Sequence, residues 1–599
     1  MHRLAGWFGH GADDAARTLE AMLAACNVGR PPHTHAESAL GLAASQALAV
    51  TDDLAAVIAG RPRFAEGLLS GPAAATALLD LWRKHGRDTP KHLTGSYALA
   101  IVDRRARGVF LALDRIGAER LCFAASPRGV VFSSQADMVT AHPAVGRTLD
   151  PQGLFNYLYF FQVPAPGSIF QGVEKLLPAQ WAWCQDGQVS RGFHWALHYR
   201  DEPRDDFEAQ RERFHEILRA SVGRARGDEE VSAFLSGGTD SSTVCGLLRE
   251  QAGRARTFSI GFDANGFDEI EYVRIAARRY GLDSQEYYLQ QADVMEAIPV
   301  IARHYDEPFA NESAVPTYFC AKLAAAEGFK VMLAGDGGDE IFGGNERYAK
   351  QKVFERYFLV PDALRKGLLE PLVNLPGLSA LGLVRKAQSY IRQANIPLPE
   401  RMESYNFIYR QPLDEMFDGG FLGQVDAALP AALLKEVYDR ADSDSFINRM
   451  LHLDIKFTLA DNDLRKVNGM TEAAGIEVRY PLLDDAMMDF SGEVPPDWKV
   501  RGQYLRWFFK KALTGFLPDE IINKSKHGFG LPFGVWAREY APLRERVEDR
   551  LSDLKKRAIL RPDYIDLVRN EHMTGHATYF GRSIWLMLAL EEWLAERGL

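Results

Sequence analysis

The stretch Phe234-Leu235-Ser236-Gly237-Gly238-Thr239-Asp240-Ser241-Ser242 decides how the centre of this 599-residue chain folds. A short apolar segment, Val231–Leu235, precedes the stretch and predicts a buried strand, and a helical pattern follows from Thr243. In a strand–turn–helix unit of this kind, glycines let the backbone approach an anion, and the first helical amides point at it. Serine hydroxyls add donors, and Asp240 adds a carboxylate that suits Mg²⁺. The stretch therefore predicts a phosphate cradle.

The spacing of this stretch differs from the two commonest phosphate-binding motifs. It has no lysine, so it is not G-x-x-x-x-G-K-[ST], and it is not G-x-G-x-x-G. For this stretch alone, a serine-rich turn without a ligand remains the alternative.

A second loop carries an unusual density of acids. The apolar run that begins at Val331 ends in Gly335–Gly344, which holds five glycines and three carboxylates. Carboxylates this close repel one another unless a cation bridges them. We predict that Asp339 is a second Mg²⁺ ligand beside Asp240; an acidic surface turn is the alternative.

Alternating strands and helices surround both loops. The pattern predicts helices over 207–221 and 268–280 and strands over 231–235, 256–262 and 285–289. Such alternation is typical of a parallel sheet wrapped by helices, in which ligands bind at the carboxyl ends of the strands. The phosphate cradle would lie at that edge.

The first third of the chain has a different texture. Short apolar strands are predicted over 97–102, 108–113, 121–125 and 130–133, with helices over 13–26 and 72–85. Sequential short strands separated by turns indicate packed antiparallel sheets. We therefore expect two domains, residues 1–200 and residues 201–599.

Composition excludes several classes of protein. The formal net charge of -10, with scattered basic residues, gives no indication of nucleic-acid binding. Five cysteines lie far apart with no C-x-x-C pair, which argues against a disulfide framework or a metal cluster. The amino terminus does not resemble a signal peptide, and no apolar run is long enough to span a bilayer. We expect a cytoplasmic protein with neither nucleic acid nor membrane as a partner.

Five motifs occur in the order found in one known superfamily. They are Ser236–Ser242, Asp306-Glu307-Pro308-Phe309, Gly335–Gly344, Glu477–Asp484 and Lys526–Pro532. Together they resemble the asparagine synthetase superfamily, which includes β-lactam synthetases and lasso-peptide cyclases. The resemblance implies an α/β plus α+β fold: an amino-terminal Ntn-type sandwich of antiparallel sheets and helices, then a PP-loop parallel-sheet domain of the adenine-nucleotide α-hydrolase type with a helical carboxyl-terminal part.

The resemblance also implies residue-level roles with ATP and Mg²⁺ as cofactors. Asp240 and Asp339 would bind the metal, and Lys526 and Asp336 would be catalytic, the lysine by stabilising developing negative charge. ATP would be bound by Leu235, Ser236, Gly237, Gly238, Asp240, Ser241, Ser242, Ile260, Ala334 and Gly335. Other residues of the substrate pocket are expected from the helical region 345–470.

The amino-terminal third resembles the glutaminase domain of class II glutamine amidotransferases. Gly95–Ala98, Asp114–Gly117 and Val131–Ser134 carry this likeness. The family begins Met-Cys-Gly-Ile and uses the cysteine as its nucleophile, whereas this chain has His2, and imidazole does not replace a thiolate in acyl transfer. The R-G-P-D glutamine-binding element is also missing, the nearest text being Gly29-Arg30-Pro31-Pro32. The domain is therefore expected to have kept its fold and lost glutamine hydrolysis.

These observations together predict an ATP-dependent amide-forming ligase. It would activate a carboxylate as an acyl-adenylate and pass the acyl group to an amine or to ammonia, as in a biosynthetic tailoring step such as lasso-type peptide cyclisation. Asparagine synthesis from free ammonia and a catalytically silent scaffold are the alternatives, and a homodimer is left open. Three outlying side chains have simpler interpretations. Cys26 is expected in the core, and His572 and His576 on a solvated helix face.

Overall fold

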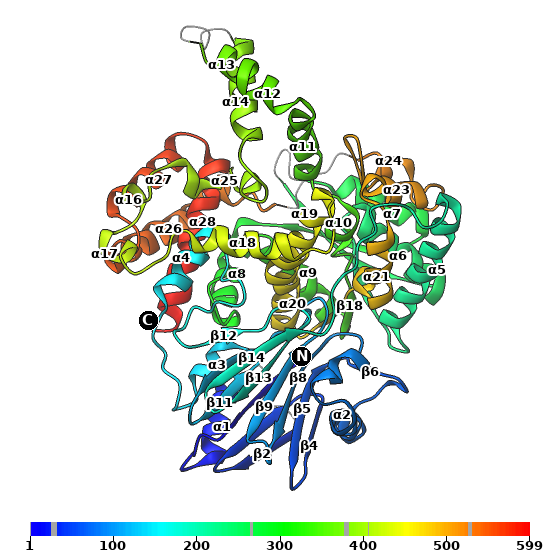
Figure 1. Cartoon of the computed structure of the whole chain (residues 1–599), viewed down its shortest axis with the longest axis vertical. Coiled ribbons are helices and arrows are strands. Elements are labelled where there is room, and N and C mark those ends of the chain that lie inside the picture. Colours follow the sequence, from blue (N-terminus) through cyan, green and yellow to red (C-terminus); the bar gives the residue numbers. More distant parts are fainter. Residues whose placement is uncertain (1, 26–32, 264–267, 376–381, 405, 525–529) are drawn as a thin grey trace.

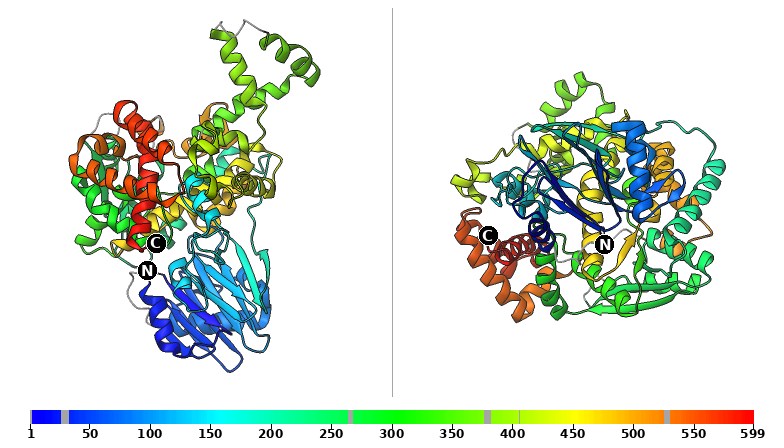
Figure 2. Two further views of the ribbon diagram at one scale, coloured as in Figure 1. Left: turned by 90° about the vertical axis from the view of Figure 1, so that its left-hand side faces the viewer. Right: turned by 90° about the horizontal axis from the view of Figure 1, so that it is seen from below.

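The computed structural model describes residues 2–25, 33–263, 268–375, 382–404, 406–524 and 530–599 (Figure 1). Three large sheets organise these residues. Two antiparallel sheets of six strands form the amino-terminal part, and a parallel sheet of five strands forms the centre of the rest. In Figures 1 and 2 the antiparallel sheets lie at one end of the molecule and a helical arm projects from the other.

The amino-terminal part is a sandwich of the two antiparallel sheets. Their strand orders are β12-β10-β11-β1-β3-β2 and β14-β13-β9-β8-β5-β4. The strands of the first are β1 (Leu4–Phe8), β2 (His33–Glu37), β3 (Leu40–Ala44), β10 (Cys122–Ser126), β11 (Gly129–Ser133) and β12 (Glu174–Lys175). Those of the second are β4 (Ala47–Val50), β5 (Leu54–Gly60), β8 (Tyr97–Asp103), β9 (Gly108–Leu113), β13 (Gln180–Gln185) and β14 (Gln188–Phe193).

Apolar side chains fill the space between these two sheets. Apolar side chains also cover the outer face of each sheet, where helices pack against them. Leu4 and Leu42 of one sheet meet Val57 and Val102 of the other in a fully buried cluster. Helix α2 (Gly71–His85) covers the outer face of the second sheet, and α1 (Ala15–Ala24) and α3 (Ala136–Thr140) cover that of the first. The sandwich predicted from the short strands is confirmed.

The central sheet is parallel throughout and has the order β17-β16-β15-β18-β19. Its strands are β15 (Ser232–Phe234), β16 (Arg256–Phe262), β17 (Asp283–Leu289), β18 (Val331–Leu333) and β19 (Glu477–Arg479). The chain adds β16 and β17 on one side of β15 and then returns to add β18 on the other. The strand order therefore reverses between β15 and β18, which is the place where open parallel sheets bind ligands.

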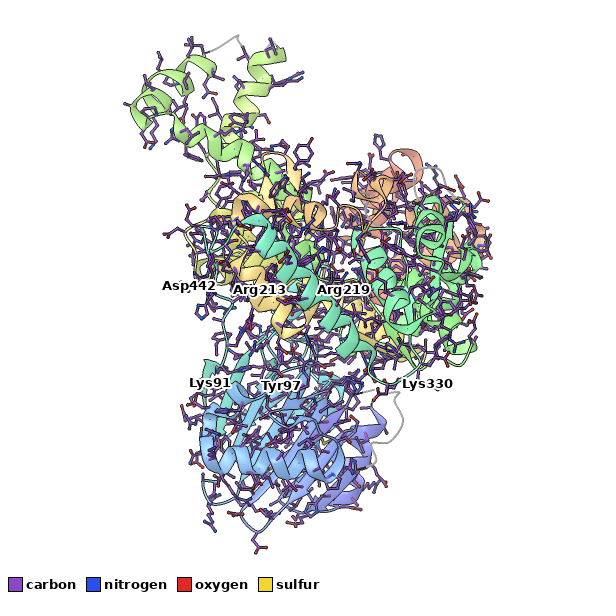
Figure 3. All side chains as sticks on the ribbon, turned by 90° about the vertical axis from the view of Figure 1, so that its right-hand side faces the viewer. Lys91, Tyr97, Arg213, Arg219, Lys330 and Asp442 are labelled. Carbon is purple, nitrogen blue, oxygen red and sulfur yellow. The ribbon has the colours of Figure 1, made fainter. Side chains whose placement is uncertain are left out.

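Helices cover both faces of this sheet and form the remainder of the chain. Those nearest the sheet are α5 (Phe207–Arg226), α6 (Thr239–Ala252), α7 (Ile270–Tyr280), α8 (Gln291–His304), α9 (Ala314–Ala326) and α20 (Leu464–Ala473). A separate helical group includes α18 (Leu429–Arg440), α19 (Phe446–Asp454), α25 (Phe533–Glu539), α26 (Ala541–Leu554), α27 (Pro562–Thr574) and α28 (Ala577–Glu596). Figure 3 shows Arg213 and Arg219 of α5 on the outside of the molecule. In that view α5 lies above the sandwich, which carries Lys91 and Tyr97.

A buried ionic cluster joins the sandwich to the rest of the chain. Asp306 accepts hydrogen bonds from Arg120 (2.7 Å) and from the amide of Ala136 (2.7 Å), both in the sandwich. Glu307 pairs with Lys175 at 2.6 Å and with Arg120 at 3.1 Å. Burial would raise the pKa of Asp306, but Arg120 and Arg465 outweigh it and hold that pKa well below its usual range. The Asp-Glu-Pro-Phe motif therefore fastens the two parts together.

Candidate active site

The two glycine-rich loops lie side by side at the carboxyl ends of β15 and β18, at the reversal of strand order. A cavity of about 580 Å³ opens between them. A Cβ on Gly335 would come within 2.6 Å of the amide nitrogen of Ser241, so only glycine permits this approach of one loop to the other. The close packing of the loops brings their side chains to the same cavity.

Asp240 and Asp339 converge in this cavity, as the sequence predicted. Glycines again make the room, because a Cβ on Gly338 would overlap the carboxylate of Asp240, and a Cβ on Gly344 would overlap that of Asp339. Two carboxylates beside a helix amino terminus fit a Mg²⁺ ion whose remaining ligands are phosphate oxygens and water. No cluster of three or more His, Cys, Asp or Glu able to hold a metal occurs among the described residues.

The guanidinium of Arg506 connects the two aspartates. It forms ion pairs with Asp240 and, at 3.1 Å, with Asp339, and it donates a hydrogen bond of 2.7 Å to the hydroxyl of Thr239. Burial would lower the pKa of Arg506, but the carboxylates of Asp240 and Asp339 raise it, so the cation is fixed. Arg506 also has a φ of +56°, a left-handed conformation that non-glycine residues adopt at a cost and that is concentrated at functional sites.

The predicted phosphate cradle consists of the first turn of α6 and the serines before it. The hydroxyls of Ser236 and Ser241 lie 2.9 Å apart, and the amide N–H of Ser236 donates to the hydroxyl of Ser241 at 3.1 Å. Among the described residues, a Cβ on Gly238 would meet the Ser236 hydroxyl alone, at 3.4 Å, so these residues leave space above this glycine. This arrangement of hydroxyls and helix amides is suited to a pyrophosphate.

Asp336 lies in the same cavity, close to a lysine that the sequence motifs do not include. Lys466 of α20 donates to Asp463 at 2.9 Å. Burial raises the pKa of Asp336 to about 6, with Asp463 and Asp240 adding to the rise and Lys466 opposing it. Asp336 is thus poised to change protonation state close to neutral pH.

The structure brings together most of the residues that the sequence assigns to ATP. Seven line the cavity: Leu235, Ser236, Gly238, Asp240, Ser241, Ile260 and Gly335. Gly237, Ser242 and Ala334 are not among the lining residues and support the loops from behind. Lys526 lies in the segment 525–529, outside the described residues.

The other walls of the cavity differ from the expectation that they come from region 345–470. Of that region only Glu346, Asp463, Lys466 and Val467 are among the lining residues. Sequence reasoning missed the main contributor, the segment from Gln503 to Lys524, which brings in Arg506, Lys510 and Lys524. Lys524 pairs with Glu269 at 3.0 Å. Its position two residues before Lys526 was the sequence signal that could have indicated that this segment reaches the cavity.

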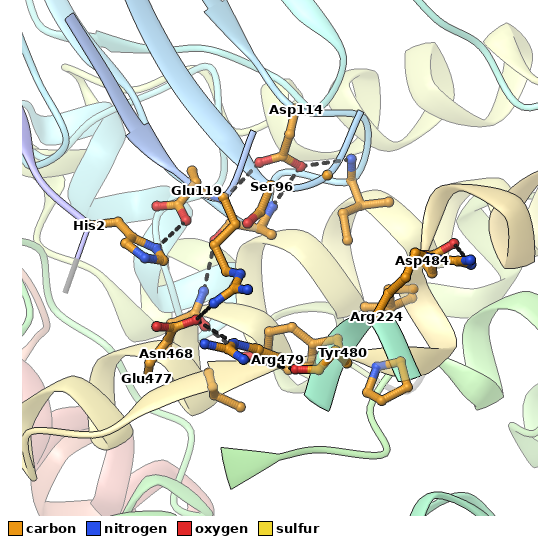
Figure 4. Close-up of a pocket in the computed structure, with 18 of the residues that line it drawn as sticks. His2, Ser96, Asp114, Glu119, Arg224, Asn468, Glu477, Arg479, Tyr480 and Asp484 are labelled. Atoms are coloured by element: carbon orange, nitrogen blue, oxygen red, sulfur yellow. Dashed lines mark hydrogen bonds and ion pairs between the residues drawn. The ribbon is translucent and has the colours of Figure 1, made fainter. Parts of the chain in front are cut away.

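A second cavity, of about 380 Å³, lies between the sandwich and the rest of the chain, and residue 2 faces it (Figure 4). His2 pairs with Glu119 at 2.8 Å. Burial would lower the pKa of His2, but Glu119 outweighs it and the pKa is raised. The imidazole is therefore engaged by Glu119, and an imidazole does not replace a thiolate in acyl transfer.

Ion pairs across the domain boundary line this cavity. Arg63 of the sandwich pairs with Asp484 at 3.0 Å and with Asp485 at 2.9 Å, and the amide of Gly95 donates to Asp485 at 2.7 Å. Asp114, in the segment that resembles the glutaminase motif, accepts from the backbone amides of residues 97, 116, 118 and 119. Its carboxylate holds a loop in place.

The two outlying histidines do not share a solvated helix face. His572 is buried and its Nε2 donates to the carbonyl of Gly534 at 2.7 Å, so that part of the prediction is wrong. His576 is exposed and precedes α28 as its N-cap. The cause is a close approach of α25 to α27 and α28 that places residue 572 inside, which i, i+4 spacing cannot reveal. Cys26 lies outside the described residues, as do Arg30, Pro31 and Pro32.

An Ntn-type sandwich followed by a parallel sheet with two glycine loops at its switch point defines an amidotransferase-like class with a nucleotide site. Comparison with known families gives the same result: the family described as asparagine synthase matches residues 213–595, and the glutamine amidotransferase domain matches residues 69–195. This chain belongs to the asparagine synthase family, whose members are asparagine synthetase-like, ATP-dependent amidating enzymes.

Relatives extend over most of the chain at low identity. Asparagine synthetase [glutamine-hydrolyzing] 1 of Bacillus subtilis (strain 168) is 26% identical over 519 residues, which are 86% of this chain and 80% of that protein. A putative asparagine synthetase [glutamine-hydrolyzing] of Mycobacterium bovis is 26% identical over 548 residues, 87% of this chain and 79% of that protein. Amidase chry2 of Gibberella zeae is 21% identical over 532 residues, 80% of this chain and 75% of that protein. Among the described residues, none of the helices has the length and apolarity of a membrane span.

Proposed function

We propose that this protein adenylates a substrate carboxylate with ATP, releases pyrophosphate, and transfers the acyl group to an amine or to ammonia that its own amino-terminal domain does not produce. One observation carries the first half of this proposal: Asp240 and Asp339, from separate glycine loops, meet at the switch point of a parallel sheet. His2, which stands where the family has its cysteine and is hydrogen-bonded to Glu119, supports the second half.

The residues around the cavity divide into two functional groups. Ser236, Gly238 and the first amides of α6 would bind the pyrophosphate, and Asp240 with Asp339 would bind Mg²⁺, which supplies positive charge against the phosphates. The backbone of Leu235 and Ile260 would contact the adenine and ribose. Leu235 is held rigidly for that task, because its carbonyl accepts a 2.7 Å hydrogen bond from Ser259.

Acyl transfer would take place on the side of the cavity where Asp336 and Lys466 lie. A carboxylate with a pKa of about 6 is ionised at neutral pH and able to accept a proton from an attacking amine. We propose Asp336 as that group and Lys526 as the cation that stabilises charge at the reacting centre. Lys466 and Lys524 line the same cavity and would assist in binding anionic substrates.

The amine is proposed to come from solution or from an amine-bearing substrate. The proteins named above as glutamine-hydrolyzing need a nucleophile that this chain lacks at residue 2. The R-G-P-D glutamine-binding element is missing as well. A tailoring role, for example amide formation within a peptide as in lasso cyclisation, fits this loss.

Two other functions remain as alternatives, and other predictions from the sequence stand as proposals. Asparagine synthesis from free ammonia would need the same nucleotide site with aspartate as the carboxylate. A silent scaffold would retain the fold without turnover. We also propose a domain boundary near residue 200, between β14 and α5, a location in the cytoplasm, and a homodimer as one open assembly state.

The test is ATP–pyrophosphate exchange with Mg²⁺ across a panel of amino acids, peptides and other carboxylates. The proposal predicts exchange that depends on one class of carboxylate and is absent in the Asp339→Asn variant. Aspartate-dependent AMP formation with ammonium would select asparagine synthesis. Binding of MgATP with no exchange for any carboxylate would select the scaffold.

A further inference from the structure

A helical arm, residues 346–394 without the undescribed 376–381, projects from the molecule on the side away from the sandwich (Figures 1 and 2). It consists of α11 (Glu346–Glu355), η2 (Arg356–Leu359), the consecutive turns α12 (Asp362–Leu364), η3 (Arg365–Leu369) and α13 (Glu370–Val373), and the returning helix α14 (Gly382–Ala394). Only Glu346, at its root, lines the nucleotide cavity. The proposed activity therefore does not account for the arm.

Leucines form an exposed stripe along the arm. Leu364, Leu368, Leu372 and Leu375 are 50%, 56%, 51% and 48% exposed. The first three recur every four residues in the consecutive helical turns over 362–373, a spacing that places them on one side of these turns, and Leu375 follows just after α13 ends. On the returning side of the arm, Leu383 is 83% exposed. Within the described residues, this stripe of half-exposed leucines is the apolar half of an amphipathic surface.

This concentration of apolar side chains is peculiar to the arm. Eight of the fifteen large apolar side chains that are exposed among the described residues belong to it. Scattered surface leucines are ordinary, but a contiguous group marks a surface that meets another apolar phase.

Charge distinguishes the arm as well. Residues 346–394 contain nine Lys and Arg and four Asp and Glu, so their net charge is +5. The whole chain has a net charge of -10, and the residues outside the arm therefore carry -15. Arg356, Arg385, Lys386 and Arg392 are exposed, and none of these four forms an ion pair with any carboxylate in the part of the chain that the structure describes. The arm thus presents unpaired positive charge beside its leucines.

We infer that the arm docks on an anionic phospholipid surface, with the leucine stripe in the interface and the arginines and lysines on lipid headgroups. Leucine on one face and Lys and Arg on the other are the composition of helices that lie in a membrane interface. A protein–protein interface would instead be enriched in aromatic residues and depleted in Lys at its centre. The net charge of -15 on the body keeps it off an anionic surface, so the arm would make the contact.

This inference departs from the sequence-based expectation of no membrane partner, which considered the total charge and spanning segments. Docking needs no span, since an interfacial helix buries only one face. It is independent of the chemistry in the nucleotide cavity.

The test is flotation of the full-length protein with vesicles of phosphatidylcholine alone or with roughly 30 mol % phosphatidylglycerol. We expect binding to the anionic vesicles that is at least about tenfold stronger than to the neutral ones and is weakened between about 0.05 M and about 0.5 M salt. Leu364→Ser with Leu368→Ser, and separately Arg385→Gln with Lys386→Gln, should each reduce binding about tenfold.

Matched controls come from leucines and arginines of similar exposure elsewhere. Leu68→Ser with Leu567→Ser changes two leucines that are 53% and 44% exposed, and Arg105→Gln with Arg254→Gln changes two arginines that are 83% and 81% exposed. Both controls should bind like wild type, and circular dichroism should report native folding of every variant. Equal binding to both vesicle types, no binding, or equal effects of arm and control variants would overturn the inference. A second result would also overturn the inference: the protein forms a concentration-dependent dimer, the leucine changes abolish that dimer, and no vesicle binding is seen. The partner of the arm would then be a second copy of this chain.

Discussion

Replacing Arg506 with glutamine removes the cation that Asp240 and Asp339 share, and its consequences follow from the geometry. The guanidinium contacts Asp240, Asp339 and Thr239 in a site where it is itself buried. Removing one member of a fully buried ion pair costs roughly 3–5 kcal/mol. The carboxylates of Asp240 and Asp339 are 19% and 24% exposed, so water screens part of the repulsion and we expect a loss of about 2 kcal/mol.

The response to Mg²⁺ distinguishes this account from a general loss of packing. In wild type, Mg²⁺ without nucleotide must compete with Arg506 for Asp240 and Asp339, so it should change the thermal midpoint little. In Arg506→Gln the metal replaces the missing cation, and about 10 mM Mg²⁺ should recover at least half of the lost stability. Differential scanning fluorimetry with and without Mg²⁺ measures both effects.

The matched control is Arg501→Gln, which removes an exposed arginine of the adjoining strand β20 (Val500–Arg501). It should leave both the midpoint and the Mg²⁺ response unchanged. An identical Mg²⁺ shift in wild type and in Arg506→Gln would refute the reasoning, because it would place the metal away from Asp240 and Asp339.

Three further predictions concern the other charged groups. Asp306→Asn should lower the free energy of unfolding by about 3 kcal/mol at neutral pH, measured by chemical denaturation. Because the pKa of Asp306 is depressed in the folded state, this difference between variant and wild type should shrink as the pH falls below about 4. A difference that stays constant with pH would contradict the ionic interpretation. The pKa of Asp336 is raised to about 6, so ionising it costs stability as the pH rises from about 4 through 6. Without divalent cations, Asp336→Asn should therefore be about 2 kcal/mol more stable than wild type at about pH 8 and equal to it below about pH 4, while amide formation falls at least about tenfold. His2→Cys should release no glutamate from glutamine, because the R-G-P-D glutamine-binding element is also missing; measured glutamate release would show that residue 2 alone accounts for the lost glutaminase activity.

Local patterns were enough to predict the fold. The strand–Gly-Gly–helix unit at 234–242 and the acidic glycine loop after Leu333 each contain their own signal, and β15, α6 and β18 are where that signal indicates. The convergence of Asp240 with Asp339 was also predictable, since carboxyl ends of parallel strands meet at one edge. Boundaries differ by a few residues: α5 runs to Arg226 where the pattern ended at 221.

The residues that were missed reach the site through long-range packing. Arg506 stands in an ordinary sequence between β21 (Tyr504–Leu505) and α23 (Trp507–Ala512), and nothing nearby indicates that its side chain crosses to Asp240. Lys466 lies one turn into α20, where lysine usually means a solvated face. His572 shows the opposite error, because spacing on a helix does not tell which face another helix will cover.

The measurement that tests the central claim most directly is a crystal structure with an ATP analogue and Mn²⁺ in place of Mg²⁺, using the anomalous signal of the metal. The account predicts a Mn²⁺ peak bound by Asp240 and Asp339, with the phosphates against Ser236, Gly238 and the first turn of α6, and Arg506 displaced from at least one carboxylate. A nucleotide bound elsewhere, or a metal peak that involves neither aspartate, would contradict it.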